Sequence, residues 1–161
     1  MADNLRKWPS VTGDQLIDCA RTYINTPWRH AQKVKGLGID CAQLIAAVLQ
    51  EVGVPVVDKL DYSKHDEFNT LITTIELYCN RLDDGVIVEK GDILIFRSLC
   101  QEKKIYNHVG FYTGKSFIHA YADPAYKRVI EERLSETWKS YVIYAYRYKC
   151  LSLENVGEVT L

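Results

Sequence analysis

The sequence predicts an α+β domain in which N-terminal helices pack on one face of a five- to six-stranded antiparallel sheet. Two observations carry this prediction. Residues 12–80 place apolar side chains at helical spacing, whereas residues 92–148 form short segments rich in β-branched and aromatic residues, separated by turn signals. The length of 161 residues suits one domain, which we expect to span residues 1–161 with its core at about 12–148.

The composition is that of an ordinary globular protein. Hydrophobic residues make up 47% of the chain and charged residues 25%, a balance that excludes extensive disorder. With 20 basic and 21 acidic residues the formal net charge is -1, so charge gives no reason to expect nucleic acid or an anionic membrane as a partner. No apolar run is long enough for a membrane-spanning helix, and the N-terminus has no apolar signal-peptide core.

The five cysteines are odd in number and widely spaced, so they cannot all pair in disulfides. They form no CxxC motif, which argues against a zinc ribbon. A chain made in a reducing compartment is the simplest interpretation. Together with the missing signal peptide, this predicts a protein that is cytoplasmic or is exported by a phage-like or other non-Sec route.

Three helices are expected in the first half of the chain. Residues 12–15 (TGDQ) have the form of a capping box, and the helix that they open should end near the Asn-Thr-Pro segment at 25–27. A loop over residues 28–39 should lead to a second helix that begins at Asp40-Cys41. A third helix is expected within residues 66–80, where apolar residues again recur at helical spacing.

The second half of the chain predicts the strands of the sheet. The expected strands are residues 92–97, 107–113, 116–122, 128–134 and 141–148. Because the connections between them are short, we expect consecutive strands to pair as an antiparallel meander. The tail at 151–161 is expected to be irregular.

Cys41 stands where a glycine-containing loop becomes a helix, with Asp40 as the expected N-cap. A cysteine in the first helical turn lies at the positive end of the helix dipole, which stabilises a thiolate, and the nearby N–H groups can stabilise an oxyanion. Cys41 also shares a helical face with Leu44 and Val48, so a buried packing cysteine is the alternative interpretation. The other four cysteines have no comparable setting and are expected to be packing residues.

Two histidines flank the turn at Thr113-Gly114. If this is a two-residue turn, His108 stands directly opposite His119, close enough for the two rings to form a hydrogen bond. A thiolate nucleophile needs an imidazole as general base and acid, and that imidazole needs a polar partner to fix its tautomer. Cys41, His108 and His119 can fill these three roles in that order. The alternative for each histidine is a ring that is hydrogen-bonded within the sheet.

Several motifs follow one another along the chain in a recognisable order. They are residues 38–41 (GIDC), 91–96 (GDILIF), 108–112 (HVGFY) and 118–120 (IHA). In this order they resemble the NlpC/P60 family of cysteine peptidases, and the resemblance covers about residues 12–148. Residues 26–30 (TPWRH) also resemble the phage-type and gene-transfer-agent-type members of that family.

The resemblance implies a papain-like fold in which Cys41 is the nucleophile, His108 the general base and acid, and His119 the group that orients His108. It implies hydrolysis of an amide bond in bacterial cell-wall peptides, typically the γ-D-glutamyl-diaminopimelate bond of a peptidoglycan stem peptide or muropeptide. No metal and no organic cofactor are expected. Asp40 matches a family position that helps to bind the amine-bearing end of the substrate.

Other positions depart from the family pattern. Trp28 stands where members often have tyrosine and His30 where many have tryptophan, so both are candidate substrate-binding residues, with loop packing as the alternative. Ala42 and Gln43 replace the usual Ser-Gly pair after the cysteine. These departures motivate a second hypothesis, a catalytically inactive module that binds cell-wall or peptide ligands. A third hypothesis is a zinc site with thiolate and imidazole ligands from Cys41, His108, His119 and His30.

Overall fold

The computed structural model describes residues 8–57, 67–97 and 106–153. Cys100, expected to be a packing residue, lies outside these ranges. The elements in chain order are β1 (Val11–Thr12), α1 (Gly13–Arg21), β2 (Lys33–Val34), β3 (Gly38–Ile39), α2 (Cys41–Glu51), α3 (Glu67–Tyr78), β4 (Cys79–Arg81), β5 (Ile93–Arg97), β6 (Tyr106–Tyr112), β7 (Ser116–Tyr121), β8 (Arg128–Arg133), α4 (Glu136–Tyr141), β9 (Val142–Tyr148) and β10 (Leu151–Ser152). No helix in the described ranges is long and apolar enough to cross a membrane.

The centre of the fold is a six-stranded antiparallel sheet with the strand order β4-β9-β5-β6-β7-β8. This confirms the predicted five- to six-stranded antiparallel sheet and the α+β class. Strands β5 to β8 form the predicted meander, but the meander prediction is wrong for β9, which returns to pair with β5. The reason is that β5 is buried along most of its length, so its second edge needs a partner strand for its backbone N–H and C=O groups.

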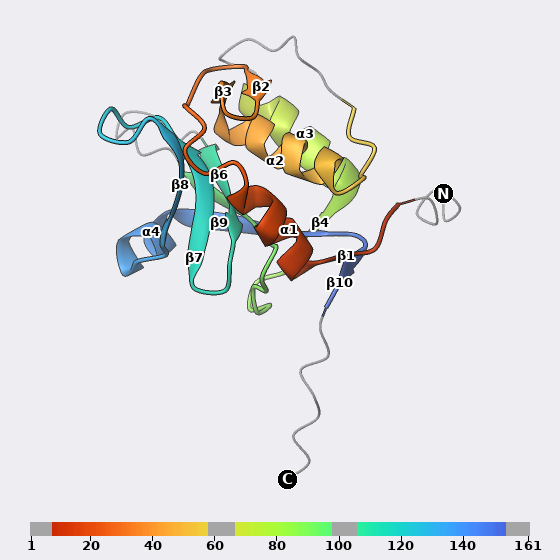
Figure 1. Ribbon diagram of the computed structural model, residues 1–161. Helices are drawn as coiled ribbons and strands as arrows, with labels where there is room; N and C mark the ends of the chain where they lie inside the picture. The colour runs from red at the N-terminus through yellow and green to blue at the C-terminus, as the bar shows by residue number, and fades with distance from the viewer. Residues whose placement is uncertain (1–7, 58–66, 98–105, 154–161) are drawn as a thin grey trace.

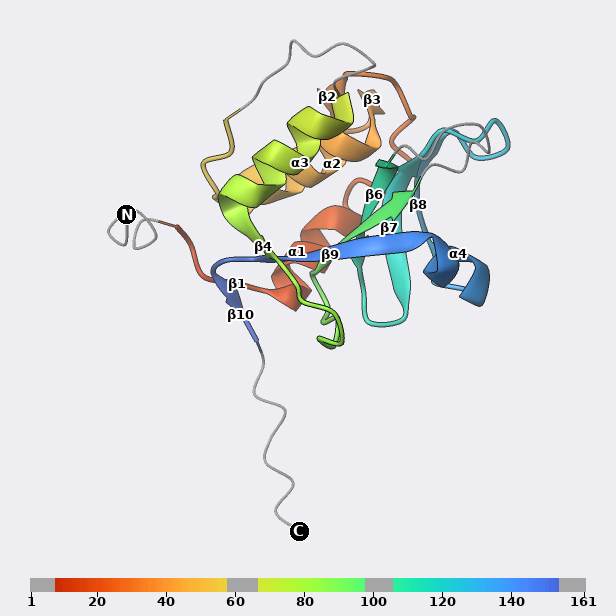
Figure 2. The same ribbon diagram turned by 180° about the vertical axis from the view of Figure 1, so that it is seen from behind.

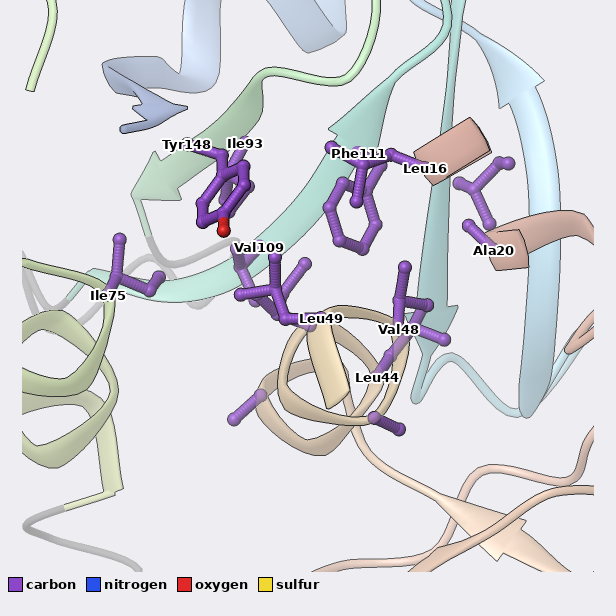
Figure 3. Packing of buried hydrophobic residues seen from close by; sticks show 14 of the residues in the cluster. Leu16, Ala20, Leu44, Val48, Leu49, Ile75, Ile93, Val109, Phe111 and Tyr148 are labelled. Carbon is purple, nitrogen blue, oxygen red and sulfur yellow. The ribbon is translucent and has the colours of Figure 1, made fainter. Parts of the chain in front are cut away.

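Helices α1, α2 and α3 pack on one face of this sheet (Figure 1). Figure 3 shows Leu44, Val48 and Leu49 of α2 turned toward Val109 and Phe111 of β6. These side chains belong to one large cluster of buried residues, which we call the helix-facing core. The predicted packing of the N-terminal helices on one face is confirmed.

The opposite face of the sheet carries a smaller cluster. Leu94 and Phe96 of β5 and Phe117 of β7 form it, and Trp138 packs against them. Trp138 belongs to α4, which Figure 2 shows beside the sheet. We call these residues the α4-facing cluster. Helix α4 is N-capped by Ser135, whose hydroxyl accepts the Trp138 N–H at 3.3 Å.

The short elements were not predicted from the sequence. The expected loop at 28–39 contains the β2–β3 hairpin, and the third helix ends at Tyr78, where β4 begins. Residues 151–152, in the tail that was expected to be irregular, pair in parallel with β1. The first helix ends at Arg21, earlier than expected, although its capping box is confirmed. Strands of two or three residues leave no periodic pattern in the sequence, because a few backbone hydrogen bonds define them.

Asp92, in the Gly-Asp motif, has a structural role that the sequence did not reveal. Its fully buried carboxylate accepts two hydrogen bonds from Arg147 of β9, from Nε at 2.9 Å and from Nη2 at 2.7 Å. It also accepts the Glu89 N–H at 2.8 Å. This paired buried charge fixes the start of β5 against β9.

Candidate active site

The position of Cys41 is set by Asp40, which caps α2. One Asp40 oxygen accepts the Gln43 N–H at 2.8 Å, which confirms the predicted N-cap, and the other accepts the Ala31 N–H at 2.7 Å. Asp40 is only 1% exposed. Its carboxylate therefore joins the preceding loop to the helix start and holds Cys41 as the first residue of α2.

The Cys41 side chain is half-buried and packs against the helix-facing core. The first turn of α2 contains no acidic residue that would oppose a negative charge on the sulfur. The backbone N–H groups of this turn and the helix dipole favour an anion at the same place. The local setting therefore suits a thiolate, and the nucleophile role of Cys41 stays a prediction.

Backbone hydrogen bonds connect the start of α2 to the start of β8 through the segment that carries Trp28. The Ile39 N–H donates to Pro27 O at 3.0 Å, and the Trp28 N–H donates to Lys127 O at 2.8 Å. The half-buried Trp28 side chain packs against the helix-facing core, and His30 is also half-buried. Trp28 thus lies between the segment that leads to Cys41 and the strand that pairs with β7.

His108 of β6 and His119 of β7 form a hydrogen-bonded pair. The Nε2 of His108 lies 2.6 Å from the Nδ1 of His119, and the rings meet edge-on at an interplanar angle of 76°. His108 is 7% exposed and His119 is 0% exposed. The predicted contact between the two rings is confirmed.

The predicted strand register, however, is wrong by two residues. Tyr112 pairs with Phe117, because the turn spans residues 113–116 and is closed by the Thr113 N–H, which donates to Ser116 O at 2.9 Å. A shift of two residues keeps every side chain on its face of the sheet. His108 and His119 are therefore diagonal neighbours, a separation that their long side chains still span.

Gly110 provides the room for this diagonal contact. A Cβ atom at Gly110 would lie 3.1 Å from the Cβ of His119 and 2.8 Å from the backbone oxygen of Ile118. Both distances are shorter than ordinary carbon contacts. The glycine of the His-Val-Gly motif therefore lets β7 approach β6 closely beside the histidine pair.

Aromatic side chains of the α4-facing cluster, together with Tyr121, lie around the pair. The ring centroids of Phe96 and Trp138 lie 5.7 and 6.0 Å from that of His108. Phe117 lies 4.3 Å from His119, and Tyr121 lies 5.1 Å from it. This enclosure buries His119 completely and leaves His108 slightly exposed.

Burial determines the protonation of both histidines. It lowers the pKa of His108 well below its ordinary value, and the neighbouring His119 lowers it further. Burial also lowers the pKa of His119, and the carboxylate of Glu132 partly opposes this shift. Both rings are therefore neutral at pH 7, and a neutral imidazole is the form that can accept a proton from a thiol.

Two other cysteines of the described ranges, Cys19 and Cys79, have thiols with a raised pKa. Burial raises the pKa of Cys19 to about 11 and that of Cys79 to about 12. Both thiols stay protonated at neutral pH, which agrees with the prediction that they are packing residues.

The described residues do not support the zinc hypothesis. Within residues 8–57, 67–97 and 106–153, no group of three or more histidine, cysteine, aspartate or glutamate side chains could hold a metal ion.

The sequence analysis did not single out Glu132, which lies beside the histidine pair. Its Oε1 is 3.4 Å from the Nε2 of His119. In the β7–β8 register His119 faces Ile130, so Glu132 projects from the same face of the sheet two residues further along. The alternation of the segment 128–134 would have placed Glu132 there, had the pairing of β7 with β8 been known.

Comparison with known proteins identifies the fold. The NlpC/P60 family protein from Bacillus cereus superposes with a TM-score of 0.61 at 22% identity, over 87% of this chain and 41% of that chain. The NlpC/p60 domain of the peptidoglycan hydrolase SagA gives 0.60 at 20% identity, over 85% of this chain and 99% of that domain. NlpC1 from Trichomonas vaginalis gives 0.59 at 20% identity, over 84% of this chain and 44% of that chain.

These similarities show that the chain has the NlpC/P60 fold, as the sequence predicted. The chain spans less than half the length of the Bacillus and Trichomonas proteins and matches nearly the whole SagA domain. At the level of sequence, no family model matches the chain and no curated protein is significantly similar to it.

Proposed function

We propose that this protein is a cysteine hydrolase that cleaves an amide bond in bacterial cell-wall peptides. The observation that carries the proposal is the buried His108–His119 hydrogen bond of 2.6 Å within an NlpC/P60 fold. The proposed substrate is a peptidoglycan stem peptide or muropeptide, cleaved at the γ-D-glutamyl-diaminopimelate bond or a related isopeptide. The similarity to the SagA domain, which is described as part of a peptidoglycan hydrolase, supports this substrate class.

In the proposed mechanism His108 takes the proton of the Cys41 thiol, and the thiolate attacks the carbonyl carbon of the amide. The tetrahedral intermediate collapses as His108 gives its proton to the leaving nitrogen, so the C–N bond breaks and a thioester remains on Cys41. His108 then takes a proton from water, the resulting hydroxide attacks the thioester, and the carboxylic acid leaves as the thiol forms again. His119 holds His108 in one orientation throughout.

The backbone supports the proposed pairing of Cys41 with His108. Main-chain hydrogen bonds run from Ile39 through Pro27 and Trp28 to the start of β8, and β8 pairs with the strand that carries His119. The start of α2 is thereby tied to the strands of the histidine pair.

Trp28, His30 and Asp40 are the proposed substrate-binding residues. Trp28 and His30 are half-buried, so each retains surface that a ligand can contact. The Trp28 indole N–H can donate a hydrogen bond but cannot accept one, so we expect it to face an acceptor of the substrate. Asp40 is almost completely buried, and we expect it to act on the substrate mainly by fixing the loop and the helix start.

The resemblance of residues 26–30 to phage-type and gene-transfer-agent-type members extends the proposal to that branch of the family. Delivery by a phage-like or other non-Sec route, or action on muropeptides in the cytoplasm, fits this assignment.

The test is product analysis by mass spectrometry on defined muropeptides, with the wild type, C41A and C19A. We expect the wild type and C19A to release the same two fragments and C41A to release none. Cys19 is the matched control because it is also half-buried but has a raised pKa. Cleavage by C41A at the wild-type rate would refute the mechanism. Binding of the muropeptide without cleavage by the wild type would replace it with the inactive-module hypothesis.

A further inference from the structure

Two buried polar atoms face each other behind the histidine pair. The Nε2 of His119 and the Oε1 of Glu132 are 3.4 Å apart, and neither forms a hydrogen bond with any other group in the described ranges. Buried polar atoms in proteins nearly always have a partner. A short approach of Glu132 to His119 would satisfy both atoms at once.

The placement of Glu132 differs from that of its neighbour on β8. Glu131 projects from the other face of the sheet, where its carboxylate accepts hydrogen bonds from Arg21 at 3.0 and 3.1 Å and from Ser116 at 2.6 Å. Glu132 projects from the face of the histidines, and its side chain is 27% exposed. The two glutamates therefore offer a matched comparison within one strand.

A carboxylate at this position dictates where the protons of both rings lie. An ionised carboxylate can only accept, so the His119 Nε2 facing it must carry a hydrogen. The neutral His119 ring then has a lone pair on Nδ1, the atom that lies 2.6 Å from His108 Nε2. His108 must donate from Nε2 in that contact, which leaves its own Nδ1 as the basic nitrogen.

We propose that Glu132 is a positioning residue, which fixes both imidazoles as Nε2–H tautomers and so keeps Nδ1 of His108 available to the Cys41 thiol. This inference rests on the proposed function for its catalytic meaning. The tautomers themselves can be measured whether or not the protein hydrolyses a substrate.

The experiment is long-range ¹H–¹⁵N NMR correlation of the histidine rings in the ¹⁵N-labelled full chain. We expect both His108 and His119 to be Nε2–H tautomers in the wild type. In E132A we expect His119 to shift toward a mixture with the Nδ1–H form, because its Nε2 has lost its acceptor. E132Q retains an acceptor oxygen and should keep more of the Nε2–H form than E132A does. E131Q should leave both tautomers unchanged.

The functional readouts are kcat on a muropeptide and the alkylation rate of Cys41 by iodoacetamide, followed by peptide mass spectrometry. Loss of the carboxylate or carbonyl that orients a metal-bound histidine typically lowers affinity or activity by roughly 10- to 100-fold, and we use that range by analogy. We expect kcat of E132A to fall in this range, with E132Q closer to the wild type and E131Q equal to it. The alkylation rate of Cys41 should fall in the same order.

The outcomes distinguish the proposed role of Glu132 from the proposed hydrolase function. Unchanged tautomers in E132A would overturn the inference, and so would shifted tautomers with unchanged kcat and alkylation rate. If the wild type does not hydrolyse muropeptides, the proposed function fails, and the tautomers together with the Cys41 alkylation rate still decide the role of Glu132. If E132A does not fold, E132Q against E131Q makes the same comparison.

Discussion

The two faces of the central sheet are built from the same strands but have different chemistry. On the helix-facing core, β6 presents Val109 and Phe111 to the aliphatic side chains of α2 (Figure 3). On the other face, the same strand presents His108, which meets His119 among the aromatic rings of the α4-facing cluster. Alternation along β6 thus separates a face that holds the fold together from a face that holds an ionisable pair.

Each face of the sheet contributes a different property to the molecule. The helix-facing core buries aliphatic area, and its contribution to the free energy of unfolding scales with the area removed from water. The α4-facing cluster buries two groups that water would otherwise solvate, which costs stability but fixes their position and protonation. Substitutions on the two faces should therefore change different measured quantities.

The largest expected effect is on activity and comes from the face of the histidines. H108Q removes the proposed general base and acid but keeps a polar side chain of similar size. We expect kcat on a muropeptide to fall by about 10²–10⁴-fold, while the free energy of unfolding changes by less than about 2 kcal/mol. Steady-state kinetics and urea denaturation measure the two quantities. A variant that keeps its activity would remove His108 from the mechanism.

The next effect is on stability and comes from the helix-facing core. F111A removes a fully buried aromatic ring from β6 and leaves a cavity. We expect the free energy of unfolding to fall by about 3–5 kcal/mol. Where the variant remains folded, kcat should equal that of the wild type. Urea denaturation and kinetics at low temperature test this. A large fall in kcat with a small loss of stability would contradict the proposed difference between the two faces of the sheet.

The third effect is a pH dependence of the free energy of unfolding, which we expect from the face of the histidines and not from the helix-facing core. The pKa of His108 and that of His119 are lowered in the folded state from the ordinary value of 6.5, so the unfolded chain binds more protons as the pH falls below about 6.5. The free energy of unfolding should therefore fall on acidification from pH 7.5 to 5.5, by at most about 1.4 kcal/mol per pH unit for each histidine. The dependence should weaken in H108Q and persist in F111A. Denaturation curves at the two pH values measure it, and equal slopes in wild type and H108Q would contradict it.

The smallest effect concerns the aromatic cover. Trp138 lies 5.5 Å from His119 and 4.9 Å from Phe117 between ring centroids. W138L keeps an apolar side chain but admits water, so we expect a loss of about 1 kcal/mol in stability and a pKa of His108 closer to its ordinary value. NMR titration of the histidine rings tests this. An unchanged pKa would mean that the strands alone exclude water from the pair.

Most of the architecture could be predicted from the sequence because it follows from periodicity. The capping box at Thr12, the N-cap at Asp40 and the strands of the meander depend on local patterns, and the structure confirms them. The β9–β5 pairing and the β2–β3 hairpin could not be predicted, because strand order and two-residue strands are set by tertiary contacts.

One contact of the candidate site could be predicted from the sequence. The contact between His108 and His119 was predicted from a strand register that is wrong by two residues. The contact is still present, because a shift of two residues leaves both side chains on the same face of the sheet. Glu132 was missed, since its place beside His119 depends on the pairing of β7 with β8. The catalytic roles of Cys41, His108 and His119 stay predictions. The same holds for the substrate-binding roles of Trp28, His30 and Asp40.

The central claim is that Cys41 and His108 act as one unit, and the alkylation rate of Cys41 tests it most directly. The rate of carbamidomethylation at pH 7 is followed by peptide mass spectrometry in the wild type and H108Q, with Cys150 as the internal reference. If Cys41 and His108 act together, Cys41 should react at least about tenfold more slowly in H108Q than in the wild type. Cys150 should react at the same rate in both proteins. Equal rates at Cys41 in the two proteins would contradict the account.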